Sequence, residues 1–402
     1  MLHYLWLLLP VAALSGWLAA RARYRGRRAT ERKEPRSPFL SSRYIRGLNY
    51  LLNEQQDKAI EVFIEMVEVD SETVETHIVL GNLFRRRGEV DRAIRIHQNL
   101  IARPNLSLDQ RRQALLELGK DYMRAGLLDR AESVFHELVE DGIRQEEPYR
   151  LLREIYEQEK EWQRAIEVCR QQQKIGDRDL SLLMAHYHCE LGEQELAQGA
   201  LASAMEHART ARGLCAACVR GLLLLAEVVR ARGDSGRSMK LLRTAAVEHP
   251  DMLPVLLPPI IEGFQRENDP AALEDWLRSL LEARPRPSVM LALINLLEQQ
   301  GRRQEARALV EEGLEQGRMS AEVMRRYAGL LAEEYSRDDT SPIPVLSTAL
   351  ARLEETRPAV QCRQCGFQAT KLSWQCPGCH GWDTMRPLDE WQNLKESESH
   401  EP

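Results

Sequence analysis

The middle of the chain repeats itself, and this repeat limits the fold more than any other feature of the sequence. Four copies of a small residue that would open a second helix are spaced 34, 38 and 34 residues apart, at Ala59, Ala93, Ala131 and Ala165. Twelve residues before them stand Gly47, Gly81, Gly119 and Arg153, and nine before them stand Tyr50, Phe84, Tyr122 and Tyr156. Small residues let two helices cross closely, and an aromatic ring fills the space beside the crossing. One such hairpin cannot bury its apolar face, so the copies must stack.

The period is that of the tetratricopeptide repeat, which is built from two antiparallel helices. Weaker copies follow at Gly192 with Ala197, Gly233 with Ser238, Ala272 with Trp276, and Gly301 with Ala306. The sequence therefore predicts an all-α solenoid over residues 40–335 that closes with a helix at Ala321–Tyr335. The spacing lapses near residues 103–111 and 207–218, where we expect longer loops between repeats.

The concave face of such a solenoid is lined mainly by the first helix of each repeat and is where partners bind. By register, Asn82, Arg85, Lys120 and Met123 are expected to face this groove. Ordinary solvated positions carry the same residue types, so the register alone leaves both interpretations open.

Four cysteines near the end of the chain stand at a spacing that favours metal binding. Cys362 pairs with Cys365 and Cys376 with Cys379, with ten residues between the pairs. Two such turns can enclose one ion in four thiolates, which leaves no open position for a catalytic water. Zn and Fe both accept this ligand set, so a structural clip and a one-electron iron site remain. Disulfides or loose thiols are the alternatives to a metal.

The amino terminus predicts a membrane anchor. Residues 4–20 carry no charge, and the segment 21–36 that follows is rich in arginine. A cleaved signal peptide is the alternative, but its basic residues would precede the apolar run. The positive-inside rule then places the amino terminus outside and the bulk of the chain in the cytoplasm. Residues 21–36 are expected to lie against anionic lipid headgroups.

These features divide the chain into six parts. They are a transmembrane helix at 1–20, a basic juxtamembrane linker at 21–39, the solenoid at 40–335, a linker with a helix at 336–358, a metal-binding domain at 359–390 and a tail at 391–402.

Sequence motifs for catalysis are missing, since there is no phosphate-binding glycine loop, no G-x-S-x-G and no H-E-x-x-H. A net charge of −6 argues against nucleic-acid binding by the chain as a whole. His186 and His188 stand two apart, so they leave a helix on different faces and are expected to pack rather than chelate. Cys215-Ala-Ala-Cys218 would need partner residues for a redox or metal role, and with none nearby, buried small apolar residues are the preferred interpretation.

Taken together, these features resemble the lipopolysaccharide assembly protein B family over nearly the whole chain. The most specific stretches are MLHYLWLLLPVAALSGW, NEQQDKAIEVF, VLGNLFRRRGEVDRAIRIHQ, LGKDYMRAGLLDRAE and CRQCGFQATKLSWQCPGCHGW. The resemblance implies a rubredoxin-like, iron-binding domain whose ligands are the four cysteines of the two pairs. It implies a bacterial inner-membrane protein that faces the cytoplasm. It also implies that lipopolysaccharide synthesis is tuned by promoting destruction of the deacetylase LpxC by the membrane protease FtsH, and that other biosynthetic enzymes are gathered.

The sequence and the resemblance therefore predict a membrane-anchored adaptor that is not an enzyme. One alternative is an iron redox protein, although a rubredoxin separates its cysteine pairs more widely than this chain does. The other is a general scaffold for envelope enzymes that has no link to proteolysis. A homo-oligomer is compatible with all three.

Overall fold

A computed structural model describes residues 42–69, 74–141, 145–176, 179–318, 320–334 and 357–391, with a few single positions between 345 and 352. The predicted membrane anchor at 1–20, the basic linker at 21–39, most of 336–358 and the tail after 391 lie outside the described residues. Within the described part, no helix combines the length and the apolar character needed to cross a bilayer. The chain forms two compact units that divide between Pro148 and Tyr149.

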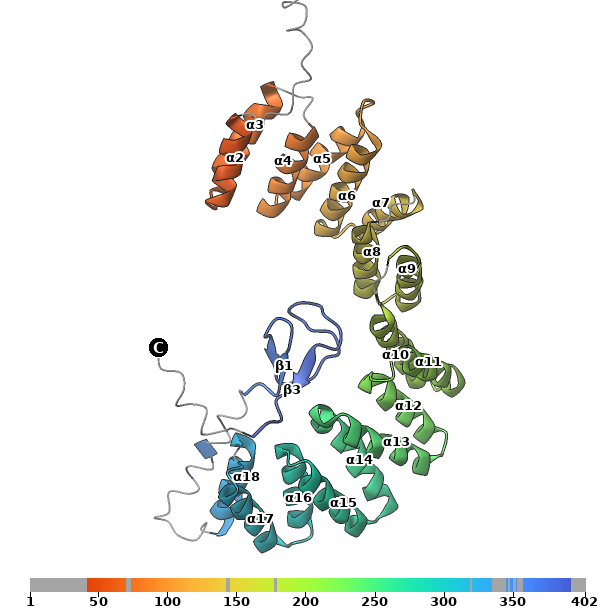
Figure 1. Ribbon diagram of the computed structural model, residues 1–402, viewed down its shortest axis with the longest axis vertical. Helices are drawn as coiled ribbons and strands as arrows, with labels where there is room; N and C mark the ends of the chain where they lie inside the picture. The colour runs from red at the N-terminus through yellow and green to blue at the C-terminus, as the bar shows by residue number, and fades with distance from the viewer. Residues whose placement is uncertain are drawn as a thin grey trace, which may run out of the picture. The chain divides into compact units, whose positions relative to one another are not determined.

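The first unit consists of helical hairpins in sequence order, each packed on the next (Figure 1). Its helices are α2 (Ser42–Leu52), α3 (Gln56–Val69), α4 (Val74–Arg87), α5 (Val90–Ile101), α6 (Leu108–Arg124) and α7 (Leu128–Glu140). Tight glycine turns with a left-handed backbone join α4 to α5 at Gly88 and α6 to α7 at Gly126. The buried faces of these helices carry the apolar residues of the repeat, so the predicted solenoid is confirmed in this part of the chain.

The glycine of each repeat is needed for the closest helix contact. A Cβ atom added to Gly47 would lie 2.7 Å from the ring of Phe63, and one added to Gly119 would lie 2.3 Å from Phe135. Both rings are fully buried. The glycine on the first helix therefore leaves room for the ring that comes sixteen residues later, on the second helix.

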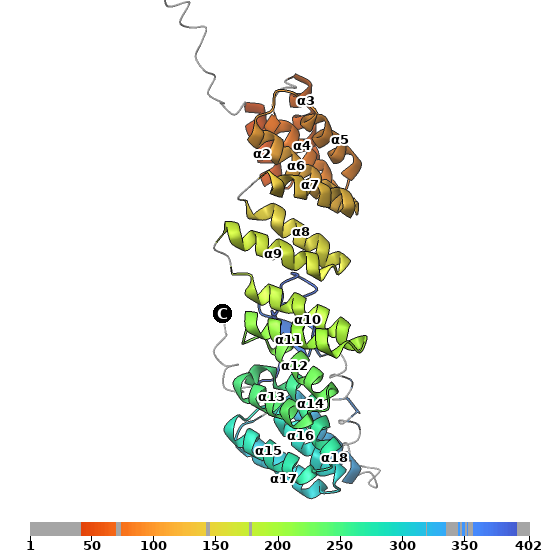
Figure 2. The same cartoon turned by 90° about the vertical axis from the view of Figure 1, so that its right-hand side faces the viewer.

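The second unit continues the same architecture. Its helices are α8 (Glu146–Glu159), α9 (Trp162–Ile175), α10 (Ser181–Ala197), α11 (Leu201–Leu214), α12 (Val219–Ala231), α13 (Ser235–Glu248), α14 (Leu253–Glu267), α15 (Pro270–Ala283), α16 (Pro287–Gln299), α17 (Arg303–Glu315) and α18 (Ala321–Glu334). A short 3-10 helix, η2 (Pro250–Met252), precedes α14. Figure 2 shows the hairpins of this unit stacked in order. A large cluster of buried apolar side chains runs from α12 to α18. The closing helix is confirmed, since α18 matches the predicted range to within one residue.

Arg153 occupies the glycine position of its repeat, and the packing has adjusted to it. The residue sixteen positions later is Cys169, whose side chain is much smaller than phenylalanine and is fully buried. The Arg153 guanidinium donates to Oε1 of Gln172 over 2.7 Å. The larger side chain on the first helix is therefore offset by a smaller one on the second.

The prediction of a longer loop at residues 207–218 is wrong. Helix α11 continues to Leu214, and the connection to α12 is the short segment 215–218. The repeat spacing lapses here because the first helix of this repeat, α10, is 17 residues long, whereas the first helix of the repeat before it, α8, has 14. The loop expected at 103–111 is shorter than predicted, because Ser107 and Gln110 form a capping box that starts α6 at Leu108.

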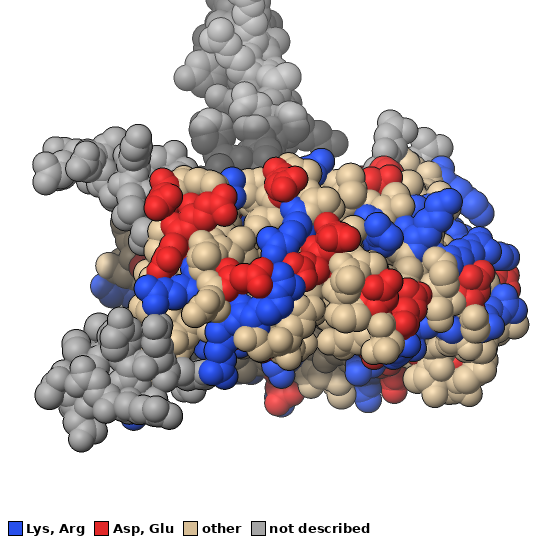
Figure 3. Space-filling model, turned by 90° about the horizontal axis from the view of Figure 1, so that it is seen from below, with Lys and Arg blue, Asp and Glu red and all other residues tan. Residues whose placement is uncertain are grey.

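The surface carries charges of both signs side by side. On the face seen in Figure 3, Lys and Arg side chains alternate with Asp and Glu across the described atoms. Ion pairs of the last repeats are of this kind, such as Arg302 with Glu274 at 2.6 Å and Arg307 with Glu311 at 2.7 Å. The described atoms of this face therefore do not present the single-sign field on which nucleic-acid binding depends.

Candidate metal centre

A small three-stranded sheet carries the four cysteines. Its strands are β1 (Val360–Cys362), β2 (Gln368–Ala369) and β3 (Met385–Pro387), in the antiparallel order β2-β1-β3. The first cysteine pair lies in the turn between β1 and β2, and the second lies in the loop between β2 and β3. We call this domain the knuckle.

The two cysteine turns are built alike. The amide of Gly366 donates to the carbonyl of Cys362 over 3.0 Å, and the amide of His380 donates to the carbonyl of Cys376 over 2.9 Å. The residue that closes each turn has a left-handed backbone, with φ of 76° at Gly366 and 56° at His380. Glycine adopts this conformation freely, whereas a histidine there costs about 1–2 kcal/mol. The second turn is therefore strained where the first is not.

The four sulfurs converge on one point. All Sγ atoms lie within 4.8 Å of one another, and Cys362 to Cys379 and Cys365 to Cys376 are both 3.7 Å apart. In a tetrahedron with metal–sulfur bonds of about 2.3 Å, neighbouring sulfurs are separated by roughly 3.8 Å. The arrangement therefore fits one ion held by four thiolates, with each close pair linking one turn to the other.

Donors around the sulfurs favour the thiolate form that binds metal. The amides of Gln364 and Gly378 donate to the sulfurs of Cys362 and Cys376 over 3.4 Å, and the Cys362 thiol itself donates to the Thr384 hydroxyl oxygen over 3.3 Å. The contact with Thr384, helped by backbone amides, lowers the pKa of the Cys362 thiol to about 6. Cys365 is the exposed member of the set, while Cys362 and Cys376 are buried.

The knuckle has little core of its own. Its buried side chains are Val360, Cys362, Cys376 and Met385. So small a cluster cannot offset the entropy of ordering the domain, so a bound ion would supply folding free energy of order 10 kcal/mol. With its shell closed by four thiolates, the ion would act as a structural clip or a one-electron centre.

Trp382 fixes one end of the knuckle to the helices α8, α9 and α10. Its ring meets those of Trp162 and Tyr187 edge-on, at centroid distances of 6.0 and 5.7 Å. Its Nε1 donates to Glu157 over 3.3 Å, and Nε2 of Gln375 donates to the same carboxylate over 2.8 Å. The Tyr187 hydroxyl is a third donor to Glu157. Burial raises the pKa of the Glu157 carboxyl, although these hydrogen bonds act in the opposite direction.

A buried arginine lies beside this contact between the knuckle and the helices. Arg220 on α12 is only 4% exposed and donates to Glu190 over 2.8 Å and to Glu193 over 2.7 Å. Its guanidinium carbon lies 6.0 Å from the rings of both Trp374 and Trp382. The knuckle therefore packs on the first helices of three successive repeats, α8, α10 and α12.

The comparisons with known proteins agree with this architecture. The family described as a rubredoxin metal binding domain matches residues 361–387, a tetratricopeptide repeat matches 76–109 and a PPR repeat matches 120–143. Lipopolysaccharide assembly protein B of Escherichia coli K12 is 33% identical over 392 residues, which cover 96% of this chain and 98% of that protein. The Haemophilus influenzae protein of the same name is 31% identical over 98% of this chain and 100% of its own length. This chain belongs to the lipopolysaccharide assembly protein B family.

The helical architecture also has a counterpart among solved structures. The Naa15/Naa10 complex bound to HypK-THB matches 77% of this chain and 46% of the solved chain, with a TM-score of 0.51 and 15% identity. At that identity the likeness supports the stacked-helix fold alone.

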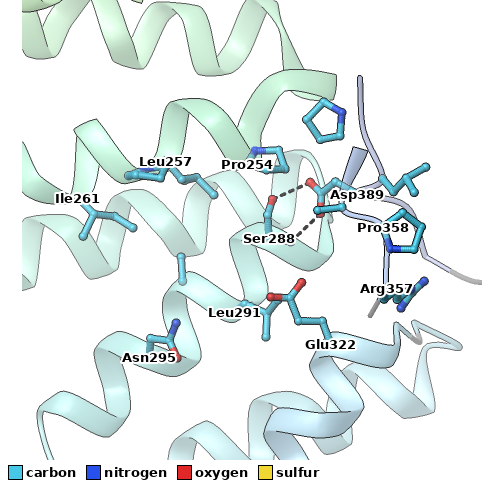
Figure 4. A pocket seen from close by; sticks show the side chains of 15 residues that line it. Pro254, Leu257, Ile261, Ser288, Leu291, Asn295, Glu322, Arg357, Pro358 and Asp389 are labelled. Carbon is cyan, nitrogen blue, oxygen red and sulfur yellow. Dashed lines mark hydrogen bonds between the residues drawn. The ribbon is translucent and has the colours of Figure 1, made fainter. Parts of the chain in front are cut away.

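In this member of the lipopolysaccharide assembly protein B family, the segment after β3 attaches to the first residues of α16 (Figure 4). Asp389 is 5% exposed and accepts from the Ser288 amide over 2.8 Å and from the Ser288 hydroxyl over 2.6 Å. Since α16 begins at Pro287, Asp389 caps that helix from about a hundred residues further along the chain. Trp391 Nε1 donates to the carbonyl of Pro285 over 2.8 Å. Arg386 adds an ion pair to Asp251 at 3.3 Å.

The four predicted groove residues lie on α4 and α6, and the structure joins three of them to carboxylates or to each other. Arg85 donates to Asp121 over 2.8 Å, to Glu117 over 2.6 Å and to Asn82 over 2.7 Å. Lys120 lies 2.9 Å from both Glu117 and Glu147. Met123 is half-buried. Partner binding at these positions stays a prediction, and it would have to compete with this ion-pair network.

The expectation that Cys215-Ala-Ala-Cys218 has no partners is wrong. Cys218 is buried, as expected, but it shares an apolar cluster with Cys189 of α10, and its sulfur lies 4.0 Å from Nε2 of His186. These residues come from another helix, so local sequence does not bring them together. His186 packs, as expected, against the rings of Trp374 and Trp382, at centroid distances of 6.1 and 5.3 Å.

Sequence reasoning missed Glu157 and Asp389 altogether. Both are acidic residues in helical or loop surroundings rich in acidic residues, and nothing local distinguishes them. Trp374 and Trp382 were a usable signal that the knuckle docks on the helices, because so small a domain cannot bury two indole rings in its own core.

Proposed function

We propose that this chain is a non-enzymatic adaptor in lipopolysaccharide assembly, the process that the name of its relatives gives. The observation that carries the proposal is the joining of a closed four-thiolate knuckle to the first helices of a repeat solenoid. Solenoids of this class act as binding surfaces, and a four-thiolate site offers no position for a reacting ligand. The two parts together make a protein-binding arm.

In this proposal the amino-terminal segment 1–20 anchors the chain in the bacterial inner membrane, with the amino terminus in the periplasm. The arginine-rich segment 21–36 contacts anionic lipid headgroups. The solenoid then works at the cytoplasmic surface, where it promotes degradation of the deacetylase LpxC by the membrane protease FtsH and gathers other lipopolysaccharide biosynthetic enzymes. The uncharged run and its basic exit support the anchor, and family membership supports the remainder.

The anchor is tested by deleting residues 1–20 and following the lifetime of the deacetylase in cells. We expect the lifetime to increase, because the adaptor no longer concentrates at the membrane. A lifetime equal to that with the intact chain would refute tethering. Replacing Arg27 and Arg28 by Gln is the milder companion variant, which keeps the apolar segment and weakens only the headgroup contact.

The metal clip is tested separately with the double variant Cys362→Ala and Cys365→Ala. We expect loss of the bound ion and loss of deacetylase turnover together. A variant that lacks metal but still supports turnover would show that the knuckle is dispensable for this function.

One observation favours a second candidate, an iron redox protein. The sulfur of Cys365 lies in an exposed residue, which gives an electron a short path from the ion to solvent or a partner. Metal analysis of protein purified without chelator, followed by a redox titration, distinguishes the two. Zinc alone in active protein would exclude the redox role, whereas iron with a reversible potential would support it.

A further inference from the structure

The first helix of the solenoid, α2, carries two apolar faces. It stands at the outer edge of the first unit (Figure 1) and packs on α3. Its inner face adds three side chains to the buried cluster of this unit, those of Tyr44, Tyr50 and Leu51. The outer face carries Ile45, Leu48 and Leu52, which lie on one side of the helix because their spacing is i, i+3 and i+7. Ile45 is 46% exposed, Leu52 is 80% exposed and Leu48 is half-buried, so this face is largely open in the described structure.

The following repeats carry polar residues where this outer face is apolar. At the register of Leu52, the next two repeats have Arg86 and Arg124, and both are exposed. At the register of Leu48, the next repeat has Asn82. The terminal repeat of a solenoid ordinarily turns a polar outer face to water. Leucine at two positions where the next repeat is polar therefore indicates that another surface covers α2.

The charge of α2 indicates what that surface is. The helix contains Arg43 and Arg46, both exposed, and no acidic residue. Arg46 follows Ile45 directly, so it leaves the helix about 100° from the centre of the outer face. An apolar face with arginine beside it and no acidic residue is the composition of a helix that lies in the interface of an anionic bilayer.

The sequence before α2 favours a membrane over a second copy of the chain. The uncharged run 4–20 is the proposed anchor, and residues 21–41 alone separate it from Ser42, where α2 begins. Among the described elements, α2 is therefore the one nearest to the proposed anchor along the chain. A symmetric pairing of two copies through the outer face would bring the arginines of both helices close together, which disfavours that contact.

We propose that α2 is a membrane-contact helix. Its outer face of Ile45, Leu48 and Leu52 enters the headgroup layer of an anionic bilayer, and Arg46 lies against the lipid phosphates. The proposal rests on the proposed anchor, which brings α2 to the bilayer, and it adds a second attachment on the solenoid itself. Two attachments restrict the orientation of the first unit at the membrane more than one attachment does.

The test uses the full-length, metal-bound chain in vesicles of phosphatidylethanolamine and phosphatidylglycerol. The photo-crosslinking residue benzoylphenylalanine replaces Ile45 or Leu52, which keeps the face apolar, and mass spectrometry identifies what each position captures on irradiation. Leu108 is the matched control, because it is 71% exposed and begins α6, two repeats further along the same unit. We expect lipid adducts at positions 45 and 52 in at least about fivefold greater yield than at position 108.

Two substitutions test the chemistry of the contact. Arg46→Gln should lower the lipid yield at position 45 by up to about fivefold, because it removes one basic residue from the anionic surface. Leu52→Ser should lower the same yield because the apolar face is smaller, whereas Leu108→Ser should leave it unchanged. An equal yield in all three variants and in the unaltered chain would overturn the proposal.

The same photo-crosslinker at Leu9 reports the proposed anchor separately. Lipid adducts at position 9 without any at 45 and 52 would overturn the contact by α2 and leave the anchor in place. Lipid adducts at 45 and 52 without any at 9 would support α2 and count against the anchor, and no lipid adduct at any of the three would overturn both.

Other occupants of the outer face give different products. An adduct that joins two copies of the chain would assign the face to a homo-oligomer, and an adduct with residues 21–41 of the same chain would assign it to the preceding segment. Either product in place of lipid would overturn the proposal, as would lipid yields at 45 and 52 no greater than at 108.

Discussion

The indole of Trp382 donates a hydrogen bond to the carboxylate of Glu157 over 3.3 Å, although 225 residues separate them in the chain. Glu157 also receives hydrogen bonds from Gln375 and Tyr187. One acidic side chain thus joins a metal domain at the end of the chain to the first helix of a repeat in the middle. We therefore expect the docking of the knuckle on α8 to require the folded, metal-bound state of the knuckle.

Replacing Glu157 by Ala should weaken knuckle docking by about 1–3 kcal/mol, because three donors lose their acceptor in a partly buried place. The measurement is the rate at which a chelator removes the metal, together with protease cleavage after residue 357. Glu154→Ala is the control, since Glu154 lies on the same helix and pairs with Arg150 at the exposed surface. Equal effects of the two substitutions would contradict a specific role for Glu157.

The same carboxyl predicts an unusual pH dependence. Burial raises the folded-state pKa of Glu157 above its ordinary 4.5, so the folded protein binds the proton more tightly than the unfolded chain does. Its contribution to stability therefore decreases as pH rises through the raised pKa and is greatest below 4.5. The Glu157→Gln variant should lose this dependence. In urea unfolding between about pH 5 and pH 8, limits that keep the thiolates metal-bound, the unaltered chain should gain stability relative to the variant as pH falls. A constant difference would be the contrary result.

Asp389→Ala should release the carboxy-terminal segment from the solenoid. It removes the cap of α16 supplied by a distant residue and leaves the Ser288 amide without this acceptor, at a cost of about 1 kcal/mol. Protease cleavage near Trp391 should accelerate. Asp269→Ala is matched to it, because Asp269 caps α15 locally through the amide of Ala272. That control should lower stability by a similar amount without loosening the segment after β3, and loosening in both would refute the linking role.

The fold was predictable where its signals are local, and the contacts that assemble the site were not. Gly47, Gly81 and Gly119 recur with the repeat, because each must clear a ring sixteen residues later on the same hairpin. The two Cys-x-x-Cys pairs were readable for the same reason, since each turn holds its own ligands. Glu157 and Asp389 instead form hydrogen bonds with residues more than a hundred positions away in the chain, and no spacing in the sequence predicts such contacts.

His380→Gly should stabilise the second cysteine turn. The substitution removes a left-handed histidine, and the expected gain of about 1 kcal/mol would slow metal loss roughly fivefold. Gly366→Ala is the reciprocal change in the first turn, where φ is also positive, and it should accelerate metal loss by a similar factor. The readout is the rate of metal transfer to a coloured chelator. If both variants moved in the same direction, backbone strain would not be the cause.

Gly119→Ala should destabilise the first unit, because the new Cβ would lie 2.3 Å from the buried ring of Phe135. Overpacking of this kind costs about 1–3 kcal/mol, measured here by urea unfolding. Gly213→Ala is the control within a helix. A Cβ there meets nothing within 4 Å, so that variant should gain up to about 1 kcal/mol from helix propensity alone.

Combining Gly119→Ala with Phe135→Leu locates the cause of that loss. If the ring is what the added methyl strikes, the smaller leucine side chain makes room for it, and the double variant should be more stable than the sum of the two single changes predicts. Additive losses would mean that Gly119 is required by the backbone instead. Because the same glycine-to-ring relationship joins Gly47 to Phe63, rescue at one repeat would support close helix crossing as the packing rule of both.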